Sequence, residues 1–165
     1  MATVNSISVP HYNVKPLTKT EQEAQIMEKA LAIAKKHFRK GKAFTNAELV
    51  AESLQLLYAG ASREVFGIMY LTNQHKLIAD EILFYGTIDG CSVYPREILK
   101  NALKHDAAAI IIFHNHPSGV LEPSQADLQI TQRIKEALAI VDIRLLDHLI
   151  VSSEGHYSFA TAGKL

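Results

Sequence analysis

Apolar residues recur at helical spacing in two segments near the start of the chain. The first segment covers residues 19 to about 40, with Thr18 or Thr20 as a possible N-cap and Gly41 just after its end. The second covers residues 46–58, so we expect one helix in each segment. The apolar residues that share one face of the first helix are Ile26, Ala30, Ile33 and Ala34, and those expected to point inward from the second are Leu49, Val50, Leu54 and Leu57.

The remaining residues alternate short apolar runs with further helical patterns. One run, residues 107–113, is too apolar to face water and predicts a central strand. Pro95 suits the first turn of a helix. Strands are expected at residues 64–71, 77–85, 107–113, 144–151 and 156–159, and helices at residues 95–105 and 124–141. This order predicts an α/β fold in which helices flank a mixed β-sheet.

The length and charge of the chain are those of one small globular domain. It has 165 residues, of which 48% are hydrophobic, and its 17 basic and 17 acidic side chains balance. No overall positive field is therefore expected to attract nucleic acid. The single cysteine, Cys91, excludes an internal disulfide and a sulfur-rich zinc site, and we expect it to be a buried apolar residue. The sequence shows no signal peptide and no apolar run near the ~20 residues of a membrane span, which predicts a cytoplasmic protein.

The fourteen residues from His114 to Asp127, HNHPSGVLEPSQAD, carry the strongest indication of chemistry. His114 and His116 stand two apart at the end of an apolar run, so on a strand their side chains would project from the same face. A loop containing Pro and Gly then leads to Asp127, where a helical pattern begins. Two imidazoles and a carboxylate suit a divalent metal, above all zinc, and three protein ligands leave a fourth position for water. The stretch therefore predicts a catalytic metal site.

Each part of this pattern also has a structural interpretation. Ser124 and Asp127 are spaced as an N-cap residue and an acidic third residue of a helix. A pair of histidines at a strand end can be solvated or structural. The two interpretations are compatible, because Ser124 can cap the helix and also donate a hydrogen bond to an oxygen at the metal. The joint occurrence of all these residues within one short stretch favours metal binding.

The pattern His-x-His, seven residues, Ser-x-x-Asp resembles the JAMM motif of MPN+ metalloproteases, the zinc isopeptidases of deubiquitinase type. Three segments further resemble the RadC family of bacterial proteins: REVFGIMYLTNQHKLIADEILFYGTI, YPREILKNALKHDAAAIIIFHNHPSG and IRLLDHLIV. The resemblance covers residues 43–165, which we assign to a single MPN domain. Residues 1–42 are assigned to an N-terminal arm and helix, in place of the helix-hairpin-helix-like region of longer RadC relatives.

The resemblance implies an architecture related to that of the cytidine deaminases and one zinc ion per chain, held by His114, His116 and Asp127. It further implies a metalloprotease or isopeptidase that cleaves an amide bond of a peptide or protein with metal-activated water. Deamination itself is disfavoured, because the H-x-E and P-C-x-x-C ligands of zinc deaminases are absent from the sequence. The resemblance identifies neither the substrate nor the oligomeric state.

Such a hydrolase needs a carboxylate that accepts a proton from water and returns it to the leaving amine. The glutamates that we consider are Glu64, Glu81, Glu97 and Glu122. Glu64 opens an apolar strand and matches the place where MPN+ proteases carry their upstream catalytic glutamate, so we assign it as the base. A solvated Glu64 paired with Arg63 is the structural alternative. Ser124 is assigned as the donor to the oxyanion.

The polar residues outside this site have simpler interpretations. Asp147 and His148 match a RadC motif, but adjacent residues of a strand face opposite sides, which favours a structural role. The remaining histidines, expected at the surface, are His11, His37, His75, His105 and His156. A basic cluster at the end of the first helix is typical of a solvated face with favourable charge near a helix C-terminus, and it consists of Lys35, Lys36, Arg39, Lys40 and Lys42. The alternative interpretation is that this cluster contacts the phosphate backbone of a nucleic acid. The alternative function is a non-catalytic DNA-associated module linked to DNA repair.

Overall fold

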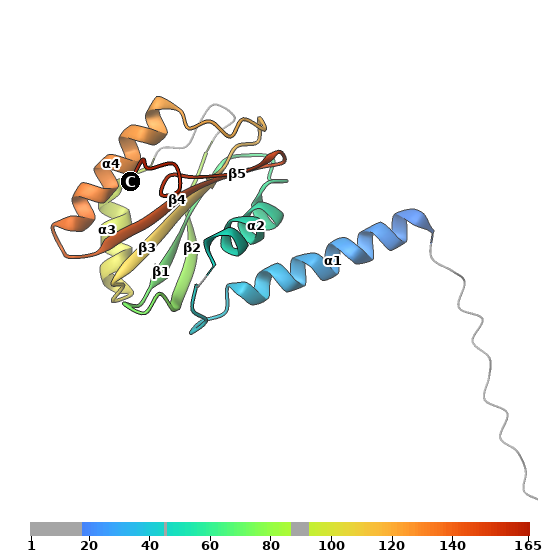
Figure 1. The fold of residues 1–165 in the computed structure, drawn as a ribbon, viewed down its shortest axis with the longest axis horizontal. Helices are drawn as coiled ribbons and strands as arrows, with labels where there is room; N and C mark the ends of the chain where they lie inside the picture. Colours follow the sequence, from blue (N-terminus) through green and yellow to red (C-terminus); the bar gives the residue numbers. More distant parts are fainter. Residues whose placement is uncertain (1–17, 45, 87–92) are drawn as a thin grey trace, which may run out of the picture.

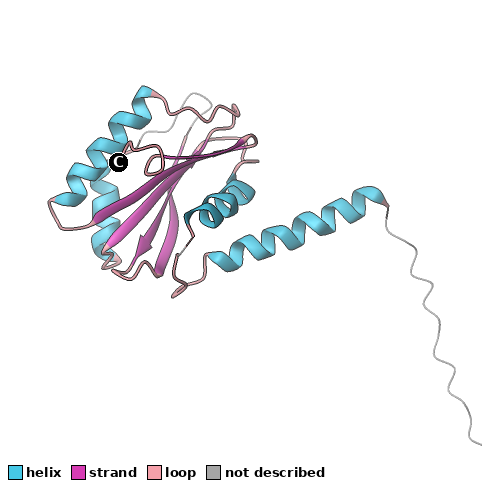
Figure 2. Cartoon of the chain, viewed as in Figure 1, coloured by secondary structure: helices cyan, strands magenta, loops and turns pink. Residues whose placement is uncertain are grey.

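The structure is a computed structural model that describes residues 18–44, 46–86 and 93–165 of the chain. Within these residues, the helices and strands follow one another in the predicted order (Figures 1 and 2). The helices are α1 (Lys19–His37), α2 (Ala47–Tyr58), α3 (Pro95–Lys104) and α4 (Gln125–Ala139), and the strands are β1 (Val65–Leu71), β2 (Leu77–Tyr85), β3 (Ala109–Asn115), β4 (Arg144–Ser152) and β5 (Gly155–Ser158). Cys91 and His11 lie outside the described residues.

The five strands form one mixed sheet in the order β2-β1-β3-β4-β5. The central strand β3 runs parallel to β4 and antiparallel to β1. The two outer pairs, β1 with β2 and β4 with β5, are antiparallel. The predicted mixed sheet flanked by helices, with the most apolar strand at its centre, is therefore confirmed.

Helices cover both faces of this sheet: α3 and α4 lie on one face and α2 on the other (Figure 1). Alternate residues of β3 supply the two cores. Ile110 and Ile112 pack in the core toward α3 and α4, whereas Ile111 and Phe113 pack in the core toward α2. The same alternation continues to the end of β3 and directs His114 to the α3/α4 face.

The α2 face depends on a close approach between β1 and β3. Gly67 of β1 pairs with Phe113 of β3, and a Cβ at Gly67 would lie 2.2 Å from the Phe113 ring. The ring therefore occupies the space that a side chain at residue 67 would fill. It also contacts Tyr58 at the end of α2, with 5.1 Å between the ring centroids. Gly67 thus lets Phe113 of β3 pack tightly against α2.

Helix α1 extends away from the body of the domain and contacts α2 (Figure 1). Thr18 caps its first turn with a reciprocal capping box to Glu21, and the helix ends at His37, earlier than predicted. Most of its apolar face is exposed: Ile33 is 58% accessible, and Ala34 is the one buried residue among the described residues of α1. The prediction that Leu49 points inward from α2 was wrong, because this side chain is exposed. None of the helices in the described part of the chain has the length and apolar character to cross a membrane.

Candidate metal centre

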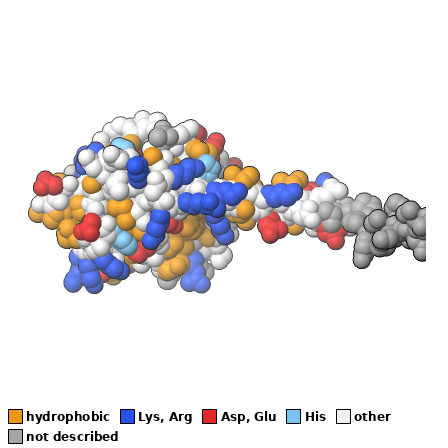
Figure 3. All heavy atoms as spheres, turned by 90° about the horizontal axis from the view of Figure 1, so that it is seen from below, with side chains coloured by type: hydrophobic (Ala, Val, Ile, Leu, Met, Phe, Trp, Pro, Cys, Tyr) orange, Lys and Arg blue, Asp and Glu red, His pale blue; other side chains and the backbone are white. Residues whose placement is uncertain are grey.

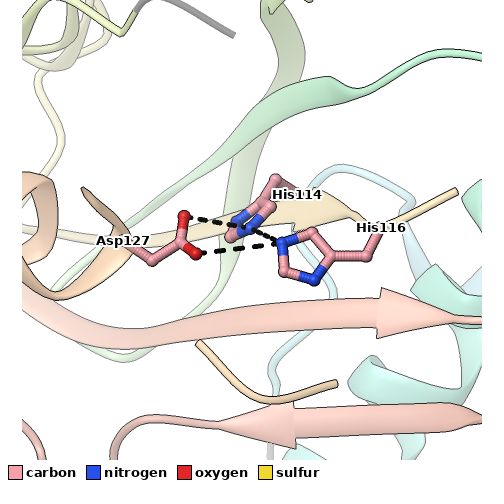
Figure 4. A group of neighbouring side chains, drawn as sticks. All are labelled: His114, His116 and Asp127. Atoms are coloured by element: carbon pink, nitrogen blue, oxygen red, sulfur yellow. Dashed lines mark hydrogen bonds and ion pairs between the residues drawn. The ribbon is translucent and has the colours of Figure 1, made fainter. Parts of the chain in front are cut away.

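Strand β3 places the two histidines at its C-terminal end. It runs to Asn115, two residues further than the sequence predicted, so His114 lies within the strand. The His116 N–H donates to the Val151 carbonyl oxygen at 2.9 Å, which continues the ladder with β4 by one residue. Both imidazoles therefore project to the same side, and their Nε2 atoms lie 2.9 Å apart (Figure 4).

Helix α4 brings the carboxylate to these imidazoles. Its N-cap is Ser124, whose hydroxyl accepts from the Asp127 N–H, while the Asp127 carboxylate accepts from the Ser124 N–H at 2.8 Å. The capping box holds the carboxylate over β3, with Oδ1 at 3.3 Å from His114 Nε2 and Oδ2 at 3.8 Å from His116 Nε2. The capping interpretation and the convergence of the candidate ligands are thus both present (Figure 4).

The donor set fits a metal ion. Ligand atoms about 2.0–2.1 Å from a tetrahedral zinc lie roughly 3.3 Å from one another, close to the separations of 2.9, 3.3 and 3.8 Å between these three groups. The His116 Nδ1 atom lies 2.6 Å from the Val120 carbonyl oxygen, so Nδ1 donates and Nε2 is left with a lone pair. Burial lowers the pKa of His114, which favours its neutral, metal-binding form. His114, His116 and Asp127 could therefore bind a metal ion.

Glu64 lies next to this group, just before β1. Phe66 pairs with His114 in the antiparallel ladder, and extending this register by two residues places Glu64 opposite His116. Glu64 also lines a cavity of about 260 Å³ together with His114 and Asp127. Burial raises the pKa of Glu64 above its usual 4.5, while His116 lowers it and the Asp127 charge raises it. In the described structure no ion pair joins Glu64 to Arg63, whereas the alternative interpretation of Glu64 expected such a pair.

The other candidate glutamates lie outside the cavity beside Glu64. Glu81 lies 3.0 Å from His105, and Glu97 pairs with Arg96 and Lys100 on the surface of α3. Glu122 is exposed in the loop before α4. None of these three lines the cavity that contains His114 and Asp127.

The buried side chain of Asn115 holds the backbone around Glu64, a role that the sequence did not indicate. Its Oδ1 accepts from the Val65 N–H at 2.7 Å, and its Nδ2 donates to the Arg63 carbonyl oxygen at 3.2 Å. These hydrogen bonds bracket Glu64 on both sides and tie its backbone to the strand that carries His114. In a strand, Asn115 points to the opposite side from the two histidines that flank it.

Asp147 and His148 face opposite sides of β4, as the alternation of a strand predicts. Asp147 points toward α2 and accepts hydrogen bonds from the His148 N–H, the Ser158 hydroxyl and the Ala160 N–H. It thereby fastens the C-terminal turn to the sheet, which is the structural role expected of it. His148 instead points toward α4 and lies 2.8 Å from His114, from its Nε2 to Nδ1. The signal in the sequence was a polar pair inside an otherwise apolar strand.

The remaining described histidines are half-buried and stand apart from this group. His37 contacts Lys42, His105 contacts Glu81, and His156 contacts Glu48. His75 lies in a turn near Arg144. Within residues 18–44, 46–86 and 93–165, the group that could hold a metal ion is therefore the one predicted from the sequence.

A mixed sheet with two imidazoles and a carboxylate at the end of its central strand is the arrangement expected of a JAMM-type domain. A family model described as the RadC-like JAB domain matches residues 44–164. The chain belongs to this RadC-like JAB domain family, and the recognition of RadC from the sequence is confirmed.

Related proteins extend over most of the chain. It is 48% identical over 149 residues to a UPF0758 protein of Vibrio cholerae, a match that covers 90% of this chain and 94% of the relative. It is also 48% identical over 147 residues to UPF0758 protein YkfG of Escherichia coli K12, covering 88% and 93% of the two chains. A UPF0758 protein of Vibrio campbellii is 52% identical over 125 residues, 76% of this chain but 56% of that longer relative. These names state no activity.

Proposed function

We propose that this protein is a zinc-dependent hydrolase that cleaves a peptide or isopeptide bond with water. The observation that carries the proposal is the convergence of two imidazole nitrogens and one carboxylate at the end of β3, each within 3.8 Å of its neighbour. His114, His116 and Asp127 would hold one zinc ion. Their side chains are 6%, 12% and 16% exposed, so the group is recessed but open to solvent on one side.

The bound metal would supply Lewis-acid polarisation of the scissile carbonyl and would make water acidic enough to react at neutral pH. Glu64 is the proposed base: its carboxylate takes a proton from the attacking water and gives it to the leaving amine. A raised pKa suits this exchange, because the carboxyl group must both accept and release a proton near the working pH. The Asn115 hydrogen bonds keep the backbone on both sides of Glu64 in place while this happens.

Ser124 remains the proposed donor to the carbonyl oxygen of the substrate. Its hydroxyl now donates to Asp127 Oδ2 at 2.6 Å. Donation to a substrate therefore requires the hydroxyl to rotate away from Asp127, whose Oδ2 keeps the hydrogen bond from the Ser124 N–H. The rotation is local, since Ser124 is exposed at the first turn of α4.

The cavity beside Glu64 is the proposed place for the substrate. Its apolar wall contains Phe66, Val93 and Ile130, and its polar wall contains Gln129 and Arg133 of α4. A cavity of about 260 Å³ admits one side chain or a short stretch of peptide, not a folded domain. The scissile bond would thus lie in an extended or flexible segment that enters from the open side.

The experiment is a hydrolysis assay on metal-stripped and zinc-reloaded protein. The probes are unfolded casein for peptide bonds and a peptide with glycine linked to a lysine Nε for isopeptide bonds, with new amines measured by fluorescence. Zinc should restore hydrolysis of at least one probe after chelation, and His116→Ala should not respond to zinc. Hydrolysis that persists unchanged after complete chelation, or in His116→Ala, would contradict a metal-dependent reaction.

The second candidate, a non-catalytic DNA-associated module, is supported by the basic cluster of residues 35–42. Lys35 and Lys36 lie in the last turn of α1. Figure 3 shows Lys and Arg side chains gathered where α1 joins the body of the domain. A zinc-loaded protein that cleaves neither probe but binds DNA with a steep dependence on salt would favour this function.

A further inference from the structure

A chain of buried hydrogen bonds connects two of the three candidate ligands behind the site. His148 of β4 has no solvent-accessible surface, and both of its ring nitrogens have partners. Its Nε2 lies 2.8 Å from His114 Nδ1, and its Nδ1 lies 2.6 Å from the hydroxyl of Thr131 on α4. The Thr131 hydroxyl in turn lies 2.5 Å from the carbonyl oxygen of Asp127. These hydrogen bonds thus connect the backbone of Asp127 to the ring of His114.

With a neutral His148, the contacts allow only one arrangement of protons along these hydrogen bonds. The Asp127 carbonyl oxygen cannot donate, so the Thr131 hydroxyl gives it its single proton. Thr131 must then accept from His148, which places the ring proton of His148 on Nδ1. A neutral His148 is left with a lone pair on Nε2, so it accepts from His114 Nδ1–H. His114 consequently presents the lone pair of Nε2 to His116 and Asp127.

We propose that His148 and Thr131 are positioning residues that select the metal-binding tautomer of His114 and orient its ring. The inference rests on the proposed function, because it concerns the same metal group. A hydrogen bond to the non-ligating nitrogen of a histidine fixes both its tautomer and its direction, and losing such partners typically lowers metal affinity about 10- to 100-fold. The Thr131 hydrogen bond to Asp127 additionally ties the first turn of α4, and with it the carboxylate, to the same chain.

A merely structural role for His148 is the alternative to be tested. Its ring also packs in the core, with 4.6 Å between its centroid and that of Phe159. A readout that packing alone would not change is therefore needed. Residue 131 allows a matched pair of variants: Thr131→Val keeps the shape of the side chain and removes the hydroxyl, whereas Thr131→Ser keeps the hydroxyl.

The first measurement is the tautomer of His114 in the metal-free wild-type protein, read from the nitrogen-15 shifts of its ring. We expect the proton on Nδ1 of both His114 and His148. A His114 ring protonated on Nε2 would overturn the proposal. This measurement needs no variant, so it decides even if a substitution at residue 131 prevents folding.

The second measurement is zinc affinity, by competition with a chromophoric chelator. Thr131→Val should bind zinc about 10- to 100-fold more weakly than the wild type, and Thr131→Ser should bind nearly as tightly. Equal affinities in a folded Thr131→Val would overturn the positioning role while leaving the metal site intact. Hydrolysis is not a readout in either measurement, so an inactive but zinc-binding wild type would count against the proposed function alone.

Discussion

The side-chain oxygen of Asn115 lies 2.7 Å from the backbone nitrogen of Val65. This hydrogen bond and the one to the Arg63 carbonyl oxygen join the end of β3 to the residues on either side of Glu64. Because Asn115 is fully buried, the Val65 N–H loses its partner inside the protein when the amide is removed. The relative placement of the proposed base and the proposed ligands therefore depends on this amide as well as on the pairing of β1 with β3.

Replacing Asn115 with alanine should separate the support of Glu64 from the binding of the metal. The Val65 N–H would be buried without a partner, so the free energy of unfolding should fall by about 1–3 kcal/mol. The rate of hydrolysis should fall, because Glu64 is less well held, while zinc content stays unchanged. Denaturant unfolding, metal analysis and the hydrolysis assay measure the three quantities. Asn101→Ala, which removes a side-chain hydrogen bond to the Glu97 carbonyl on α3, is the control expected to leave the rate unchanged.

Glu64→Gln tests the base directly. Glutamine has nearly the same shape but cannot accept a proton from water at neutral pH, so kcat should fall by roughly 10²- to 10⁴-fold. Zinc content and KM should change little, since the lost interaction belongs to the transition state. Glu122→Gln, in the loop before α4, is the matched control. If Glu122→Gln lost activity and Glu64→Gln kept it, the assignment of the base would be wrong.

The raised pKa of Glu64 predicts a pH dependence. Burial is its largest cause, and the carboxyl must be ionised to accept a proton, so kcat/KM should fall as the pH drops through a value above 4.5.

The free energy of unfolding should change with pH in the opposite direction to kcat/KM. The folded state holds this proton more tightly than the unfolded chain, so ionisation destabilises the fold as the pH rises from 4.5 through the raised pKa.

Glu64→Gln removes this titration, so its stability relative to the wild type should increase over the same pH interval. Chemical unfolding at a series of pH values, with metal-free protein, isolates the effect from metal loss in acid. A stability difference that is flat across the interval, or that has the reverse sign, would show that burial does not raise this pKa.

Asp147→Ala should weaken the fold without affecting the metal group. Three donors on β4, β5 and the following turn lose their acceptor, and hydrogen bonds to a charged group each contribute about 1.5–3 kcal/mol. We expect the free energy of unfolding to fall by about 3 kcal/mol or more, with zinc affinity retained, because Asp147 faces α2. Ser158→Ala removes one of the three donors and should have a smaller effect. Loss of zinc affinity in folded Asp147→Ala would contradict the separation of the two faces of β4.

The candidate ligands could be predicted because they are close in the sequence. His114, His116 and Asp127 lie within fourteen residues, and the alternation of a strand followed by a capped helix suffices to bring them together. Glu64 was predicted through the resemblance to MPN+ proteases, and its proximity follows from the pairing of β1 with β3. These are features that local pattern and strand pairing specify.

The supporting residues could not be predicted because their partners are distant in the sequence. His114 and His148 are 34 residues apart, and Asn115 and Val65 are 50 residues apart. The local pattern marks Asp147 and His148 as a polar pair inside an apolar strand, but it does not identify His114 as the partner of His148. Helical spacing likewise predicted α1 but not which neighbour it would have, so its exposed residues such as Ile33 were not foreseen.

The most direct test of the central claim is the zinc content of purified protein, measured by elemental analysis. The wild type should contain about one zinc ion per chain, and His116→Ala should lose it, since two ligands are too few for a stable site. His156→Ala, which removes an imidazole that contacts Glu48 away from this group, should keep it. Stoichiometric zinc retained in a folded His114→Ala/His116→Ala double variant would place the metal elsewhere and contradict the account.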